Sequence, residues 1–186
     1  MKTLKNIVAS AIVLLVLQAQ VNANELQYVF QDTKIKSESD KVANIFLGVP
    51  ATIKKDLGDK VLISVNGFID GKDIYSNDAK ELLIATLEDG FTPIAKQNNE
   101  VELVGTIDKK LLVKNPVDVW EEHEEFYFDM CTQCHGAQNV KHHTMIEWEA
   151  LFGAMKDFAQ LDEEESSYLL RYLKSNSSNG LSKESN

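Results

Sequence analysis

Cysteine and histidine are scarce in this sequence, and both are confined to its second half. Only two of the 186 residues are Cys and four are His. Residues 24–114 contain neither type, so that region lacks the side chains that most often bind metals. A structural zinc site needs several Cys or His ligands at suitable spacing, and no second C-x-x-C exists. Chemistry that depends on these ligands is therefore expected after residue 114.

Basic residues are also fewer than acidic ones. The chain has 19 Lys and Arg against 29 Asp and Glu, a formal net charge of −10. A nucleic-acid partner is therefore not expected. The negative charge can serve solubility alone, or it can steer encounter with an electropositive docking surface. Apolar residues make up 44% and charged residues 26%, which fits a folded soluble protein and excludes a disordered or many-spanning one.

Residues 1–23 have the features of a secretory leader. Lys2 and Lys5 form a basic start, the stretch 7–17 is apolar, and Val21-Asn22-Ala23 is a small-residue cleavage site. The apolar stretch is much shorter than the roughly 20 residues that span a bilayer, so no stable membrane anchor is expected. We predict a signal peptide that is cleaved after Ala23, a mature formal charge of −12 and a periplasmic location.

Both cysteines lie in one short motif, Cys131-Thr132-Gln133-Cys134-His135. C-x-x-C-H is the attachment pattern of c-type haem. On a helix, positions i, i+3 and i+4 share a face, so both thiols can reach the two vinyl groups of one porphyrin. His135 can then bind the iron as its proximal ligand. The sequence therefore predicts one haem c, covalently bound through Cys131 and Cys134.

Two other uses of the cysteines compete with haem attachment. One disulfide would be ordinary in an exported protein. A thioredoxin-like dithiol would instead lie at the N-terminus of a helix, where the dipole lowers the thiol pKa. Here Asn115-Pro116 precedes a segment rich in Glu and aromatics, Val117–His135, which predicts a helix that ends at Gly136. The cysteines would then lie at the C-terminal end of that helix, which favours haem.

Several side chains could bind the other face of the iron. The candidates are Met155, His142, His143 and Met145, and the position could also stay open. Thr144–Phe158 predicts a helix whose apolar side chains recur at helical spacing and lead to Met155. A Met on such a face could equally pack in the core. Met155 is preferred because a bound haem must have its far side filled or deliberately open. His123 lies among four glutamates, so it is expected on a solvated face and is not needed for attachment.

The region before residue 116 shows strand patterns. Val61–Ile69 has strand composition, and Asp70-Gly71 supplies a tight turn before Lys72–Tyr75. Leu82–Leu87 fits either a helix or a buried strand. Further short strand candidates are Gln27–Phe30, Ala51–Lys54, Val101–Ile107 and Leu111–Lys114. We therefore expect an α+β protein with a small β-rich, barrel-like module over residues 24–115. An α-helical c-type cytochrome domain over 116–174 and a disordered tail over 175–186 would follow.

Residues before and after the haem motif form a recognisable pattern. They are Val119-Trp120, His142-His143-Thr144, Glu147-Trp148, Met155, Phe158, Leu161 and Tyr172-Leu173. Together with C-T-Q-C-H, this pattern resembles the last haem domain of the pentahaem cytochromes that serve bacterial trimethylamine N-oxide reductase. The resemblance is strongest over residues 116–174 and weaker over 25–115.

The resemblance implies an electron relay of anaerobic respiration that passes electrons to a periplasmic molybdenum-containing N-oxide or S-oxide reductase. It also implies Cys131 and Cys134 as attachment sites, His135 as proximal ligand and Met155 as distal ligand. Members of that family begin with a membrane-anchored tetrahaem module that oxidises quinol, whereas this sequence has one C-x-x-C-H. We therefore expect a monohaem electron carrier, not an enzyme, supplied by a separate quinol-oxidising membrane cytochrome. The alternatives are a haem-based sensor and a peroxidase-like haem enzyme with a labile sixth ligand.

Overall fold

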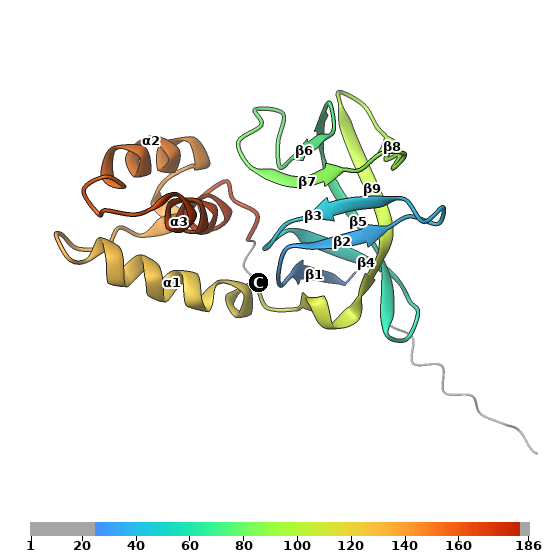
Figure 1. Ribbon diagram of the computed structural model, residues 1–186, viewed down its shortest axis with the longest axis horizontal. Helices are drawn as coiled ribbons and strands as arrows, with labels where there is room; N and C mark the ends of the chain where they lie inside the picture. The colour runs from blue at the N-terminus through green and yellow to red at the C-terminus, as the bar shows by residue number, and fades with distance from the viewer. Residues whose placement is uncertain (1–24, 183–186) are drawn as a thin grey trace, which may run out of the picture.

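Short β-strands occupy the first half of the chain and three helices the second half. The computed structural model describes residues 25–182, with the strands on one side and the helices on the other (Figure 1). The strands are β1 (Leu26–Val29), β2 (Thr33–Lys36), β3 (Val42–Ile45), β4 (Pro50–Asp56), β5 (Lys60–Asp70), β6 (Asp73–Tyr75), β7 (Leu83–Leu87), β8 (Ile94–Ala95), β9 (Glu100–Asp108) and β10 (Leu112–Val113). The helices are α1 (Val117–Cys131), α2 (Met145–Met155) and α3 (Glu163–Ser175), and two 3-10 turns cover Lys109–Leu111 and Val140–His142.

The strands form one antiparallel sheet that closes on itself. Its order is β10-β1-β4-β5-β6-β7-β3-β2-β9-β8, and β5 also pairs with β9. Six strands, β5, β6, β7, β3, β2 and β9, therefore make a closed barrel, with the other four attached at its margins. The β5–β9 ladder is the longest and runs from Lys60↔Asp108 to Phe68↔Glu100. Closure removes free edges from these six strands, which satisfies their backbone hydrogen bonds.

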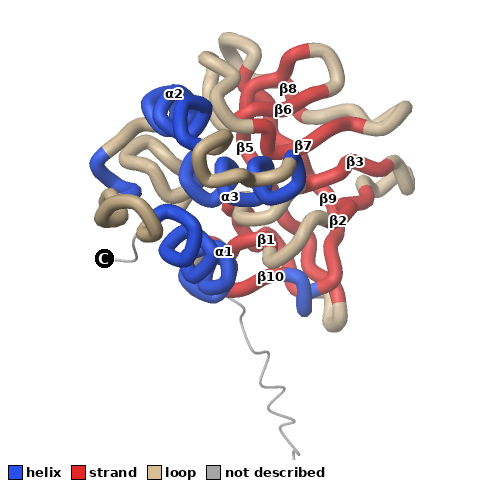
Figure 2. The backbone as a smooth tube through the Cα atoms, turned by 60° about the vertical axis from the view of Figure 1, so that its left-hand side comes forward, coloured by secondary structure: helices blue, strands red, loops and turns tan. Residues whose placement is uncertain are grey.

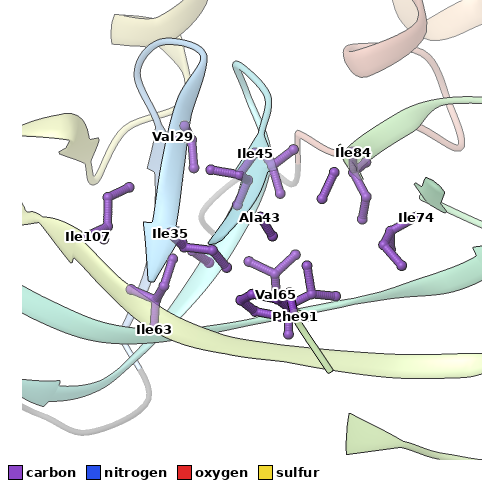
Figure 3. Close-up of a cluster of buried hydrophobic side chains, with 14 of the residues drawn as sticks. Val29, Ile35, Ala43, Ile45, Ile63, Val65, Ile74, Ile84, Phe91 and Ile107 are labelled. Carbon is purple, nitrogen blue, oxygen red and sulfur yellow. The ribbon is translucent and has the colours of Figure 1, made fainter. Parts of the chain in front are cut away.

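The barrel interior is aliphatic. Side chains alternate along β9, so that Val101, Leu103 and Ile107 are buried while their neighbours are more exposed. Ile35 and Ile63 have no exposed surface, and Figure 3 shows these side chains among others that converge inside the barrel. The buried cluster inside the barrel consists of aliphatic side chains and Phe91, whereas both cysteines and all four histidines follow residue 114.

Local signals identified several strands but not all of them. The predicted strand Val61–Ile69 is β5, and Gly71 closes the hairpin to β6 with a φ of +62°. The ambiguous segment Leu82–Leu87 forms the strand β7, because it pairs with β3 on one side and β6 on the other. Strands β2, β3 and β8 have no counterpart among the predicted segments.

The expected α+β class, with an α-helical cytochrome domain as the second half, is wrong. Ten strands and a closed barrel dominate residues 25–113, and the rest of the described chain holds three helices of 15, 11 and 13 residues. Helix content is lower than predicted because α1 ends at Cys131 instead of continuing to His135. Strand content is higher because the sequence signal of β2 is masked by Lys34 and Lys36, which flank its one fully buried residue, Ile35.

Several contacts fix the helices to the barrel, and two of them involve Trp120 and Arg171. The indole of Trp120 lies against Gly48, whose φ is +80°, and a Cβ added at Gly48 would come within 2.1 Å of this ring. Arg171 on α3 donates from Nε and Nη2 to the Leu47 carbonyl oxygen (3.0 and 2.6 Å) and from Nη1 to that of Leu83 (3.0 Å). Helices and barrel therefore share an interface, which Figure 2 shows from another side.

The chain ends of the described region also bear on the predictions. The tail expected to be disordered from Ser175 instead folds back over residues 175–182, where the Ser178 N–H donates to the His143 carbonyl oxygen (2.8 Å). The leader 1–23 and residues 183–186 lie outside the described residues. Within residues 25–182, no helix combines the length and apolar character that crossing a bilayer requires.

Candidate functional site

Helix α1 carries the C-x-x-C-H motif at its far end. It begins beside β10, where the Asn115 Oδ1 accepts a hydrogen bond from the Val117 N–H (3.2 Å). Asp118 in the first turn interacts favourably with the positive end of the helix dipole. The helix then leads away from the barrel (Figure 1), so the motif lies on the side of the molecule opposite the strands.

The helix stops inside the motif. The Thr132 N–H and the Thr132 Oγ1 both donate to the Phe128 carbonyl oxygen, at 3.1 and 2.7 Å. Cys131 is thus the last helical residue, and the chain turns through Cys134 and His135. The turn brings the three predicted haem-binding residues together in one short segment, although they do not share a continuous helical face.

The two thiols differ in their surroundings. Cys131 is half-buried against the core between the helices, and this burial raises the pKa of its thiol. Cys134 is exposed, and both residues are free cysteines. A redox-active dithiol needs a lowered thiol pKa at a helix N-terminus, and the opposite is found here. In this structure the two thiols are not joined in a disulfide.

The imidazole of His135 is exposed and oriented by its own backbone. Its Nδ1 lies 2.8 Å from the Gly136 carbonyl oxygen. A carbonyl oxygen can only accept, so Nδ1 donates in this hydrogen bond, and the neutral tautomer that this contact favours has its lone pair on Nε2. A neutral imidazole fixed in this way is the form that binds a metal.

Tyr127 holds the loop that follows the motif. Its hydroxyl donates to the Gln138 carbonyl oxygen (2.8 Å) and accepts from the Gln138 N–H (3.0 Å). Tyr127 itself is buried against Trp148 of α2, with ring centroids 6.3 Å apart. The chain after His135 is therefore attached to α1 and α2 by contacts within the protein.

The two methionine candidates for the sixth ligand differ in burial. Met145, at the start of α2, is buried, and its sulfur accepts a hydrogen bond from the Ser76 Oγ (3.8 Å) of the barrel. Met155, at the other end of α2, is 49% exposed. Because α2 starts at the barrel, its Met155 end lies on the outer side, as the end of α1 does (Figure 1). Met155 is thus available as a ligand, and it does not pack in the core.

The histidine candidates have other contacts. His143 Nε2 lies 2.6 Å from the Gln138 Oε1, and the ring meets the Trp148 indole edge-on at 4.9 Å between centroids. His142 is exposed in the 3-10 turn Val140–His142. His143 would have to leave both partners to bind iron, whereas Met155 would not.

These residues fit a c-type haem. Besides two free thiols and an imidazole with its Nε2 free, this end of the helices exposes apolar side chains that water solvates poorly. Phe128, three residues before Cys131, is 48% exposed, and Phe158, in the turn after Met155, is 80% exposed. A porphyrin is a large apolar ligand, so it would find both its attachment groups and an apolar surface here. Within residues 25–182, no group of three or more His, Cys, Asp or Glu gathers as a metal cluster.

Comparison with known proteins points to the same chemistry. The chain is 31% identical over 98 residues to the "Cytochrome c-type protein TorC" of Escherichia coli O157:H7 and to that of Escherichia coli K12. About half of the chain is thus similar to part of a c-type cytochrome of the TorC kind. The match covers 51% of this chain and about a quarter of each relative. No protein-family model matches the chain, and neither does any solved structure.

This relationship agrees with haem c as the cofactor and with electron transfer as the type of function. It leaves the number of haems open, because three quarters of each TorC chain lie outside the match. The sequence predictions for Cys131, Cys134, His135 and Met155 stand beside it as predictions about individual residues.

A buried histidine was missed by the sequence analysis. His123 lies among four glutamates in the sequence and was expected on a solvated face, yet it is only 6% exposed. Its ring stacks on Tyr168 of α3 at 3.6 Å between centroids and meets Trp120 edge-on at 5.0 Å. Neither ring nitrogen has a hydrogen-bond partner. Burial, and next the charge of Arg171, lowers the pKa of His123 to about 4.

A signal for this burial does exist in the sequence. Trp120, His123 and Tyr127 are spaced i, i+3 and i+7, which places them on one face of α1. The glutamates on both sides of His123 hide this periodicity. The imidazole therefore belongs to the helix–helix contact that supports the motif, and not to the motif itself.

Proposed function

We propose that this chain is a periplasmic electron-transfer protein of the c-type cytochrome class. It would carry one haem on Cys131 and Cys134, with His135 and Met155 as axial ligands. The observation that supports this best is the exposed C-x-x-C-H turn at the end of α1, where the Gly136 carbonyl leaves the Nε2 of His135 free. The similarity to TorC supports the same class. Bound haem would supply an iron that alternates between the ferric and ferrous states.

The residues of the chain determine how such a site would behave. Two thioether bonds, through Cys131 and Cys134, would make the cofactor permanent in a compartment where a dissociated haem is lost. A Met155 thioether favours ferrous iron and raises the reduction potential, whereas a second imidazole lowers it. Phe128 on α1 and Phe158 in the turn after α2 are exposed apolar side chains that a bound porphyrin could cover.

The proposed pathway follows from the family resemblance. The leader at residues 1–23 would deliver the chain to the periplasm. A quinol-oxidising membrane cytochrome would donate electrons, and a periplasmic molybdenum-containing N-oxide or S-oxide reductase would accept them. Stopped-flow oxidation of the reduced protein by such a reductase, with its N-oxide present, tests this step. No oxidation above the rate without the reductase would reject this acceptor but leave the cytochrome assignment intact.

The optical spectrum tests the ligands. We expect a low-spin ferric spectrum with the far-red sulfur-to-iron charge-transfer band, because a thioether binds the iron. Met155→Ala should abolish this band, whereas the matched variants His142→Ala and His143→Ala should keep it. Retention of the band in Met155→Ala would refute the assignment of that ligand.

The same measurement separates the carrier from the alternatives. A sensor or a peroxidase-like enzyme needs an open or labile sixth position. A high-spin ferric spectrum that shifts on addition of cyanide or peroxide would contradict the carrier function and favour one of them. An unchanged low-spin spectrum under both additions is the result expected for a carrier.

A further inference from the structure

A groove lies beside the haem motif, between α1 and the loop that follows it. It is a cavity of about 510 Å³, within the range of volumes that proteins use for binding. Residues 137–141 form the opposite wall, and Tyr172 of α3 contributes to the floor. The α1 wall consists of residues that share one helix face, namely Val117, Trp120, Glu124, Tyr127 and Phe128.

The α1 wall combines apolar surface with one carboxylate. Val117 and Phe128, at the two ends of the wall, are 60% and 48% exposed. Glu124 lies between them, and no other residue that lines this groove within residues 25–182 carries a negative charge. Glu124 also forms a hydrogen bond with the Tyr172 side chain, and burial first and this carboxylate next raise the pKa of Tyr172. An apolar α1 wall around one carboxylate suits a long side chain that ends in a positive charge.

Charge around the groove favours the same kind of ligand. Residues 116–182 contain 13 Asp and Glu but only 4 Lys and Arg, whereas residues 25–115 contain 15 and 12. Many barrel lysines form ion pairs, as Lys80 does with Asp70 (2.6 Å). Glu121 and Glu125 on α1 are exposed beside the groove, and Lys141 lies on the opposite wall. The negative potential is therefore concentrated on the α1 side.

The second acidic cluster of the helices is already engaged in local structure. Asp162 and Glu165 form a capping box at the start of α3, where each side chain accepts a hydrogen bond from the backbone N–H of the other (3.0 and 2.9 Å). Acidic side chains in the first turn also stabilise the helix dipole. Asp162 and Glu165 are therefore engaged with each other's backbone at the start of α3.

We propose that the groove is a docking site for a basic protein partner and receives one of its Lys or Arg side chains. The aliphatic part of that side chain would lie against Val117, Trp120 and Phe128, and its charge would meet Glu124. Phe128 precedes Cys131 by one helical turn, so a partner bound here would lie next to the haem motif. The biological role of this site rests on the proposed electron-transfer function, but the binding itself does not.

Calorimetric titration of the haem-loaded protein with a peptide of eight lysines tests the groove at low ionic strength. We expect binding that Glu124→Gln weakens about tenfold, because a charge-assisted contact is lost. The matched variant Glu163→Gln, on the α3 cluster, should change the affinity less than twofold. Phe128→Ala should weaken binding about fivefold, whereas Ile94→Ala, at an equally exposed apolar residue of the barrel, should not.

Three outcomes would overturn the proposal. These are no binding of the peptide by the unmodified protein, equal weakening by Glu124→Gln and Glu163→Gln, and tenfold tighter binding after deletion of residues 183–186. The last result would assign the groove to the chain's own end, since Ser182 already contacts Trp120 there through its Oγ (3.1 Å). Haem content and the far-red band are recorded for every variant. Their absence from the unmodified protein would contradict the proposed cytochrome function independently of the docking site, whereas their loss in a single variant would show that this substitution disturbs the haem site.

Discussion

The barrel and the helical segment, residues 117–175, are stabilised in different ways. The barrel closes its own hydrogen-bond ladder around an aliphatic interior, in which Ile35 and Ile63 are fully buried. The helical segment has a largely aromatic core that includes Trp120 and the unpaired imidazole of His123. It also leaves Phe158 80% exposed.

The difference shows which region depends on contacts outside itself for its stability. The barrel satisfies its polar and apolar groups internally, as a closed sheet can. The helical segment packs against the barrel on one side, through the contacts at Gly48 and Arg171. Under the proposed function it packs against a haem on the other side. Changes to the cofactor or to the interface should therefore destabilise the helices well before the barrel.

Removal of both thiols should have the largest effect. Cys131→Ser combined with Cys134→Ser cannot form thioethers, so we expect no haem that survives denaturing electrophoresis and haem staining. The helical circular-dichroism signal should melt at a lower temperature, because the stabilisation that comes with a bound ligand is lost. The strand signal should melt as before.

A matched change inside the motif serves as the control. Gln133→Ala leaves both thiols and His135 in place and should keep the covalent haem. Covalent haem in the double serine variant, or equal loss of the helical and strand signals, would contradict the proposed attachment and the comparison of the two regions respectively.

Gly48→Ala should have the next largest effect. The new methyl group would occupy the space of the Trp120 indole, and a φ of +80° is strained for alanine. We expect a loss of about 3 kcal/mol in the free energy of unfolding, measured with urea. Gly58→Ala isolates the backbone cost, since Gly58 has a φ of +91° and open space around it, and it should lose about 1 kcal/mol. Equal losses would show that the Trp120 contact contributes nothing.

His123 should make the stability of the helical segment depend on pH. Its pKa is about 4 in the folded protein and near 6.5 in the unfolded chain, so below pH 6.5 only the unfolded chain takes up the proton. The stability contribution is therefore full above pH 6.5 and falls as the pH drops to about 4, by at most ~3 kcal/mol.

The measurement is urea unfolding between pH 7 and pH 4. His123→Phe keeps an aromatic ring against Tyr168 and should remove this part of the pH dependence, whereas His142→Gln, at an exposed position, should leave it unchanged. A pH profile of His123→Phe that matches the unmodified protein would exclude His123 as the cause.

Features that depend only on consecutive residues could be predicted from the sequence. The β5–β6 hairpin needs only a strand pattern and Asp70-Gly71, and the haem motif is complete within five residues. Features that depend on distant partners could not. Leu82–Leu87 becomes a strand because β3 and β6 flank it, and β2 is recognisable only from its neighbours β3 and β9.

The candidate site shows the same limit. Met155 could be named from its helical spacing, but its exposure at the end of α2 needed the structure. His123 was assigned to the surface because its four glutamate neighbours were given more weight than its helical spacing. In the structure, the rings of Tyr168 and Trp120 bury it. The length of α1 was overestimated because the Thr132 contacts that end it are not visible in composition.

The hydroxyl of Tyr127 has a consequence for maturation of the protein. By bonding both backbone groups of Gln138, it shapes the segment after His135 with contacts that need no cofactor. The entropy of closing that loop is thus lost during folding and not during haem attachment. The order of attachment then depends on thiol access. Under the proposed function, exposed Cys134 is expected to form its thioether first, and half-buried Cys131, with its raised pKa, second.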